Sequence, residues 1–95
     1  MSVASRWMGR VAGVNCIVCQ QLGYGETPAV VHHIKEETGA GQRQSPFLTI
    51  PLCPQHHTDG PRGVAYHKGF REFERIYGTE LDLLAATIEA IERAR

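Results

Sequence analysis

The clearest pattern of apolar and polar residues lies near the C-terminus, in the stretch TELDLLAATIEAIERAR over residues 79–95. Apolar residues recur there at intervals of three and four, which predicts an amphipathic helix with one apolar stripe. Thr79 is suited to cap this helix, because Asp82 follows three residues later. The residues of the predicted stripe are Leu81, Leu84, Ile88 and Ile91.

Two shorter helical segments are predicted before this helix. In YHKGFREFERIYG, residues 66–78, aromatic side chains recur on one helical face and a glycine ends the pattern. These aromatic residues are Phe70, Phe73 and Tyr77. PQHHTDG, residues 54–60, predicts only a short helical turn, because its final glycine and the following proline stop a helix.

The first half of the chain predicts strands and turns. PAVVHHI, residues 28–34, and PFLTIPL, residues 46–52, are short, rich in β-branched or apolar residues, and bounded by proline. The polar, glycine-containing segment 35–45 between them predicts a loop, so we expect the two strands to pair as a hairpin. CIVCQQLGYG, residues 16–25, is typical of a knuckle-like turn closed by glycines. Residues 1–13 are weakly patterned and predict an irregular arm.

This order of elements predicts a single small α+β domain covering residues 1–95. A chain of this length has a thin hydrophobic core, and such domains often gain stability from a metal or by oligomerisation. The apolar stripe of the last helix can cover the core of its own chain, which is the more usual arrangement, or pair with a second copy in a homodimer.

Overall charge and composition exclude few classes of partner, but they indicate where in the cell the protein acts. The formal net charge is zero, and no apolar run is long enough to span a membrane. The N-terminus has no signal-peptide core, so we expect a cytosolic protein.

Basic residues nevertheless outnumber acidic ones between residues 39 and 71, where Asp59 is the single acid. The basic residues are Arg43, Arg62, Lys68 and Arg71, which predicts a local basic face.

The three cysteines predict a metal site. An odd number of cysteines containing a Cys-x-x-Cys pair fits metal ligation in a reducing compartment better than a disulfide framework. Cys16 and Cys19 form one pair of ligands, and Cys53 with His56 repeats the spacing. Four such ligands suit tetrahedral zinc. His57 could replace His56 with one more intervening residue, and the simpler alternative is that the cysteines are small buried apolar residues.

The remaining histidines predict a reactive centre. Two histidine doublets account for four of the five histidines, and His67 is the fifth. If each doublet is split, one ring can bind a metal while its neighbour faces the chemistry. A neutral imidazole can accept a proton from water, and a divalent cation opposite it can stabilise charge on a phosphate. The alternative is that one member of each doublet, or His67, only makes hydrogen bonds.

These motifs resemble a known family. Cys-x-x-Cys, followed by HHI and then LCPQHH, is similar to the HNH, or ββα-metal, nucleases, whose pattern closes with Cys-x-x-Cys-His. More closely, VHHIKEETGAGQRQSPFLTIPLC and ELDLLAATIEAI resemble the phage-encoded, RecA-dependent nucleases of the recombination-enhancement (Ref-like) type. This likeness covers residues 14–91. It implies a zinc-stabilised ββα-metal fold with C-terminal helices and a DNA endonuclease that acts in recombination.

The resemblance also implies residue roles. His33 would be the general base, and Mg²⁺ or Mn²⁺ would be the catalytic ion. His32 and His57 would bind that ion. His67 lies near the position of a further histidine that the subfamily carries after a glycine, although extra residues intervene in this sequence. The zinc ligands would be Cys16, Cys19, Cys53 and His56. The HNH asparagine has no counterpart, since the only asparagine is Asn15, which leaves Thr49 or a backbone carbonyl to orient His33.

The implied partners are DNA and a RecA-type filament in a bacterial host. Phosphates would be contacted by Arg43, Arg62, Lys68 and Arg71, although Arg71 could instead pair with Glu72 or Glu74. Two other functions compete with the endonuclease. One is a non-catalytic zinc module that binds DNA or a protein. The other, ranked last, makes Cys53 and a histidine a nucleophile and base pair.

Overall fold

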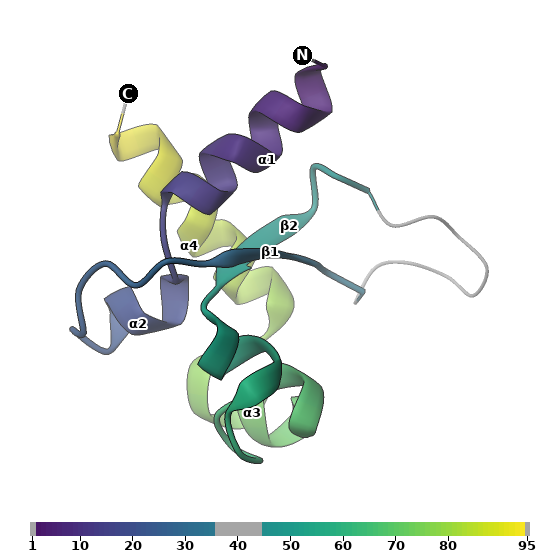
Figure 1. Ribbon diagram of the computed structural model, residues 1–95, viewed down its shortest axis with the longest axis vertical. Helices are drawn as coiled ribbons and strands as arrows, with labels where there is room; N and C mark the ends of the chain where they lie inside the picture. The colour runs from purple at the N-terminus through teal and green to yellow at the C-terminus, as the bar shows by residue number, and fades with distance from the viewer. Residues whose placement is uncertain (1, 36–44, 95) are drawn as a thin grey trace.

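The computed structural model describes residues 2–35 and 45–94 and has an α+β architecture, as predicted. A two-stranded antiparallel hairpin lies at its centre and helices surround it (Figure 1). The elements in chain order are α1 (Val3–Gly13), α2 (Ile17–Gln21), β1 (Val30–His33), β2 (Thr49–Leu52), the π-helical turn η1 (Gln55–Asp59), the 3₁₀ turn η2 (Tyr66–Lys68), α3 (Phe70–Tyr77) and α4 (Glu80–Arg93).

The predicted hairpin is confirmed, with strands shorter than the segments that predicted them. Its register pairs Val30 with Leu52 and His33 with Thr49. All four residues of β2 are buried, because α1, α2 and α4 each contact this strand. In β1 only His32 is buried. The hairpin therefore brings one face of β1 into the interior while the other strand is fully covered.

The prediction of an irregular N-terminal arm over residues 1–13 is wrong. Val3–Gly13 forms helix α1, capped by Ser2, whose hydroxyl oxygen accepts a hydrogen bond of 3.1 Å from the Ser5 amide. Val11 is fully buried, and α1 packs against both strands and α4. Val3, Trp7 and Val11 recur every four residues on one face of this helix, a stripe that the prediction of an irregular arm overlooked.

The knuckle contains a helical turn, α2, that the turn prediction did not include. Cys16 caps it, since its sulfur accepts a bond of 3.5 Å from the Cys19 amide. Asn15, immediately before it, has a φ of 68°. Asparagine tolerates this left-handed conformation better than most residues. Asn15 therefore redirects the chain from α1 into the cysteine pair.

The predicted helix over 66–78 is two elements, η2 and α3, separated at Gly69. Phe73 is fully buried, whereas Phe70 is 48% exposed, so the aromatic residues do not share one buried face. Gly78 ends α3 as predicted, with a φ of 109°. The break matters for the site because it places the η2 residues beside η1.

Helix α4 and its cap are confirmed, including both bonds of the Thr79–Asp82 capping box. The predicted stripe is partly wrong, because Leu81 and Ile88 are 38% and 39% exposed. The buried face instead includes two polar residues whose side chains are satisfied: Thr87 donates to the Leu83 carbonyl at 2.7 Å, and Glu80 binds partners described below. The buried residues of α4 are Glu80, Leu83, Leu84, Thr87 and Ile91.

The core lies between the hairpin, α2, α3 and α4. Its largest fully buried side chains include Phe73, Ile34, Ile50, Leu52 and Leu83. The three cysteines belong to this core. Within residues 2–35 and 45–94, no helix has both the length and the apolar character needed to cross a membrane.

Candidate metal centres

Four side chains form a buried cluster. Cys16 and Cys19 come from the start of α2, Cys53 follows β2, and His56 lies in η1. Each is at most 5% exposed. The sequence did not show how the two ligand pairs come together. In the structure β2 ends beside the first turn of α2, so the hairpin places Cys53 there. The structure thus brings together all four residues that the spacing predicted.

The separations within this cluster suit a tetrahedral metal. The Cys19 and Cys53 sulfurs are 3.8 Å apart, and His56 Nδ1 lies 3.6, 3.6 and 3.3 Å from the sulfurs of Cys16, Cys19 and Cys53. Zinc with Zn–S of ~2.3 Å and Zn–N of ~2.0 Å would separate two sulfurs by ~3.8 Å and a sulfur from a nitrogen by ~3.5 Å. The cluster is therefore compatible with a structural metal such as zinc.

Burial affects the protonation of these ligands. It raises the pKa of the Cys16 thiol to about 12 and lowers the pKa of His56 below its usual value. Without a cation the Cys16 thiol therefore keeps its proton, and metal binding would release it. Cys53 is 3% exposed, so its sulfur is shielded from any large substrate. This burial argues against the nucleophile role for Cys53.

Three other histidines form a second cluster. His32 comes from β1, His57 from η1 and His67 from η2, and each offers a ring nitrogen within 4.8 Å of the others. Their ring centroids are 4.7 to 5.3 Å apart. His32 is buried, His57 is half-buried and His67 is exposed, so the cluster opens to solvent. Three neutral imidazoles in this arrangement can hold one cation.

The π-helical turn η1 separates the second doublet. His56 points into the cysteine cluster and His57 joins the histidine cluster. The wider turn is closed by a 3.0 Å bond from the Gly60 amide to the Gln55 carbonyl, five residues back. A Cβ at Gly60 would lie 2.4 Å from that carbonyl oxygen. Glycine at position 60 therefore permits the turn that sends adjacent histidines to different clusters.

The first doublet is also split. His32 and His33 are successive strand residues, and strand side chains alternate between faces. His32 is 3% exposed, whereas His33 is half-buried. Both nevertheless line one pocket of about 260 Å³, together with Val31, Lys35, His57 and His67. The pocket thus places a partly accessible imidazole beside the histidine cluster.

Glu80 is a site residue that sequence reasoning missed. Its carboxylate lies 2.6 Å from His32 Nε2 and accepts a 2.9 Å bond from the Lys35 amide, and both ionisable side chains are 2% exposed. Burial alone raises the pKa of Glu80, but the bonds from His32, the Lys35 amide and Tyr66 outweigh it and hold the pKa below its usual value. An acidic residue in the first turn of a helix is usually explained by its favourable interaction with the helix dipole. The sequence therefore gave no sign that Glu80 has a role in the site.

The Glu80 contact assigns the His32 proton. An ionised carboxylate can only accept, so the hydrogen in the 2.6 Å contact is on His32 Nε2. In the neutral ring, the lone pair that can bind a cation is then on Nδ1. Burial, followed by the charge that His32 carries when protonated, lowers the pKa of His57 and of His67. Both rings therefore keep their neutral, metal-binding form further below neutral pH than a free histidine does.

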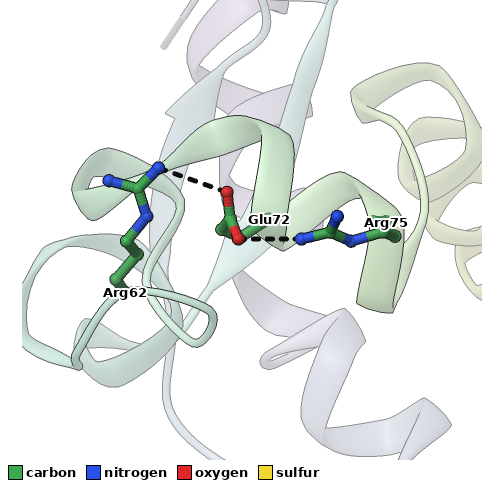
Figure 2. A network of polar contacts seen from close by, with 3 residues as sticks. All are labelled: Arg62, Glu72 and Arg75. Atoms are coloured by element: carbon green, nitrogen blue, oxygen red, sulfur yellow. Dashed lines mark hydrogen bonds and ion pairs between the residues drawn. The ribbon is translucent and has the colours of Figure 1, made fainter.

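The basic residues that were predicted to contact phosphates differ in the groups that their side chains meet. Arg62 lies 3.2 Å from Glu72, which also binds Arg75 at 2.7 Å (Figure 2). Lys68 Nζ reaches the Gly60 carbonyl at 3.5 Å, and the Arg71 guanidinium lies 5.7 Å from the Phe70 ring centroid. Glu72, offered as a partner for Arg71, thus pairs with two other arginines. Arg43 lies outside the described residues.

Thr49, considered as an orienter of His33, is opposite it in the hairpin but fully buried. Its hydroxyl donates a 3.2 Å bond to the Pro46 carbonyl. Asn15 lies in the turn before Cys16.

These features define a small α+β domain with two candidate metal centres, one buried and built from Cys₃His, the other built from three histidines beside an open pocket. Comparison with known families gives this class an identity. A family model described as "Recombination enhancement, RecA-dependent nuclease" matches residues 2–92, so the chain belongs to that family. The prediction of a nuclease with a role in recombination is confirmed at this level. The search of curated proteins found no match.

Proposed function

We propose that this protein is a metal-dependent DNA endonuclease of the HNH, or ββα-metal, type, encoded by a phage or prophage. The observation that carries the proposal is the division of the histidines. One member of the second doublet completes a buried Cys₃His cluster, while its neighbour joins His32 and His67 beside His33. A cation held by the three histidines, with His33 in the same pocket as a base, could hydrolyse a phosphodiester.

In this proposal the buried cluster holds zinc and maintains the fold. Cys16, Cys19, Cys53 and His56 are its ligands, and the ligand separations described above support this role. Structural zinc contributes ~10 kcal/mol or more to folding. A domain of this size gains only a few kcal/mol from its apolar core. The zinc cluster would therefore decide whether the polypeptide folds.

The second cluster would hold the catalytic cation through His32, His57 and His67. The cation, Mn²⁺ or Mg²⁺, would stabilise the charge that develops on the phosphate and on the departing oxygen. A set of imidazole nitrogens favours Mn²⁺ over Mg²⁺, because Mg²⁺ prefers oxygen ligands. The role of His67, which its spacing left in doubt, is supported by its ring nitrogen lying within 4.8 Å of those of His32 and His57.

Glu80 would position His32 for this task. A carboxylate that accepts from one ring nitrogen sets the tautomer and orientation of a metal-binding histidine and increases its basicity. Because Glu80 also accepts from the Lys35 amide at 2.9 Å, the carboxylate is itself held in place. We therefore assign Glu80 as a positioning residue that acts through His32.

His33 would be the general base. It lines the pocket of the histidine cluster and, unlike His32, is partly accessible to water. Its imidazole would take the proton of a water molecule as the water oxygen forms a bond to phosphorus. The opposite phosphorus–oxygen bond breaks, and the departing oxygen takes a proton from solvent. Conversion of one diester into a monoester and an alcohol consumes one water.

The binding partners follow from the same proposal. Arg62, Lys68 and Arg71, with Arg43, would contact DNA phosphates, and Arg62 would exchange its Glu72 contact for a phosphate. Such contacts position DNA without reading its sequence and weaken as salt is added. A RecA-type filament would present the substrate, consistent with the family description. The partly exposed Leu81 and Ile88 on α4 are the residues through which a homodimer would form.

The test compares wild type with His33→Ala on plasmid and single-stranded DNA. Each DNA is offered bare and in a RecA filament, with and without added Mn²⁺ or Mg²⁺. We expect wild type to cut only with added cation, and the variant to lose at least about 100-fold in rate, as for removal of a general base. Zinc content and the thermal midpoint should not change. Val30→Ala, on the exposed end of β1, is the matched control and should cut like wild type.

One result would favour the competing function. If wild type binds DNA and holds zinc but neither protein cuts any of these substrates, the chain is a non-catalytic zinc module. If His33→Ala cuts at the wild-type rate, hydrolysis stands but His33 is not its base.

A further inference from the structure

A larger cavity adjoins the histidine cluster. It has a volume of about 570 Å³ and lies between Lys35, which follows β1, and residues of η2, α3 and the start of α4. Lys35 and His67 line both this cavity and the smaller pocket that contains His32, His33 and His57. The two are therefore neighbouring parts of one surface, and a ligand in the larger cavity would extend from the reactive centre.

Phe70 gives this cavity its character. It is the first residue of α3 and lines the cavity, but 48% of it is exposed, whereas Phe73 one turn later is fully buried. The guanidinium carbon of Arg71 lies over the Phe70 ring, 5.7 Å from its centroid, and Arg71 does not line the cavity. An accessible aromatic ring together with an arginine is a combination that proteins use to stack a nucleic-acid base.

The charges indicate which part of a nucleotide would enter. Lys35 and Lys68 line the cavity and can attract a phosphate, but Glu74 and Glu80 line it as well. Two carboxylates disfavour an anion within the cavity. The arrangement suits a neutral base inside, with its phosphates at the lysines. The volume falls within the range of roughly 300–1,000 Å³ typical of small-ligand sites, which accommodates one nucleoside.

We propose that this cavity is a subsite for one unpaired nucleotide of the DNA strand, adjacent to the bond that is cut, with its base stacked on Phe70. The subsite rests on the proposed function, since the histidine cluster marks the position of the scissile phosphate. The base must be unpaired because a base within a duplex presents its face to its neighbours in the stack. The pocket would thus favour strands in which at least one nucleotide is turned out.

The first test measures binding, so it does not depend on cleavage. A fluorescent single-stranded oligonucleotide is titrated with zinc-loaded protein, without added Mn²⁺ or Mg²⁺. Phe70→Leu keeps an apolar side chain but removes the ring, and it should weaken binding roughly 5- to 150-fold, the range expected for one base–aromatic stack. Phe70→Trp should restore affinity. Ile76→Ala, an exposed apolar residue of the same helix, should bind like wild type.

The second test locates the subsite by cleavage. One abasic position is placed in a single-stranded substrate, in the filament if cutting requires it, and cut sites are mapped along the strand. Wild type should cut less at one phosphate on a fixed side of the abasic position. Phe70→Leu should cut less overall but show no such footprint. A footprint that is present in wild type and absent only in Phe70→Leu would show that the missing base normally stacks on Phe70.

The outcomes separate the two proposals. If Phe70→Leu binds the oligonucleotide as wild type does, the subsite is overturned whether or not the protein cuts DNA. If cutting occurs with the same abasic footprint in both proteins, the base lies elsewhere and the subsite is likewise overturned. If Phe70→Leu binds more weakly and Phe70→Trp recovers, but no substrate is cut, the stacking residue stands while the nuclease mechanism fails.

Discussion

Replacing Glu80 with glutamine tests the link between the buried carboxylate and the histidine cluster. Besides the bond from Tyr66, the carboxylate accepts one hydrogen from His32 Nε2 at 2.6 Å and one from the Lys35 amide at 2.9 Å. Glutamine has the same shape but only one acceptor oxygen, and its amide nitrogen donates. Whichever way the amide is turned, one of the two bonds becomes a contact between two donors. The substitution therefore changes hydrogen bonding without leaving a cavity.

The structure sets the size of the expected effect. Both side chains are 2% exposed, so water cannot replace the lost bond. A hydrogen bond to a charged group contributes about 1.5–3 kcal/mol, and we expect Glu80→Gln to lower the free energy of unfolding by that amount. His32 can relieve the contact by moving its proton to Nδ1, but this removes the lone pair that would bind the cation. Mutation of such a supporting carboxylate typically costs 10- to 100-fold in metal affinity, or about 1.4–2.8 kcal/mol.

The assay is a calorimetric titration of zinc-loaded protein with Mn²⁺, run beside chemical denaturation and a zinc count. Glu89→Gln is the matched control, because Glu89 is on the same helix with a side chain that is 64% exposed. We expect weaker Mn²⁺ binding in Glu80→Gln alone, with one zinc per chain in all three proteins. A folded Glu80→Gln protein that binds Mn²⁺ within twofold of wild type would refute the assignment of Glu80 as the residue that orients His32.

Two further predictions concern the scaffold. Cys53→Ser removes one ligand of the buried cluster. Because structural zinc binding, at ~10 kcal/mol, matches or exceeds the whole stability of a small domain, we expect circular dichroism and metal analysis to show an unfolded, zinc-poor protein. A zinc-free protein with a cooperative unfolding transition would contradict this. Gly60→Ala places a Cβ 2.4 Å from the Gln55 carbonyl and 2.9 Å from Val64 Cγ1, so we expect a loss of about 1–3 kcal/mol and weaker binding of both metals. Gly9→Ala, with no atom within 4 Å of its Cβ, should be neutral or stabilising, and an equal thermal midpoint for the two variants would show that η1 does not need Gly60.

Features that depend on neighbouring residues were determined by the sequence itself. The Cys-x-x-Cys and Cys-x-x-His spacings predicted the four residues of the buried cluster, and Thr79 with Asp82 predicted the capping box. The two proline-bounded apolar runs predicted the hairpin. Within each ligand pair and within the capping box, the interacting residues are three positions apart, so their spacing can be recognised in the sequence alone.

Tertiary structure decided what those patterns could not express. Either histidine of the second doublet could have joined the cysteines, and the π-helical turn permitted by Gly60 selected His56. Glu80 reads as a solvated acid, yet it is buried against a histidine 48 positions away. Its burial, with that of Thr87, turned α4 so that Leu81 and Ile88 remain partly exposed. Hydrophobic periodicity treats every polar residue as external, whereas a polar side chain can be internal once distant parts of the chain satisfy its hydrogen bonds.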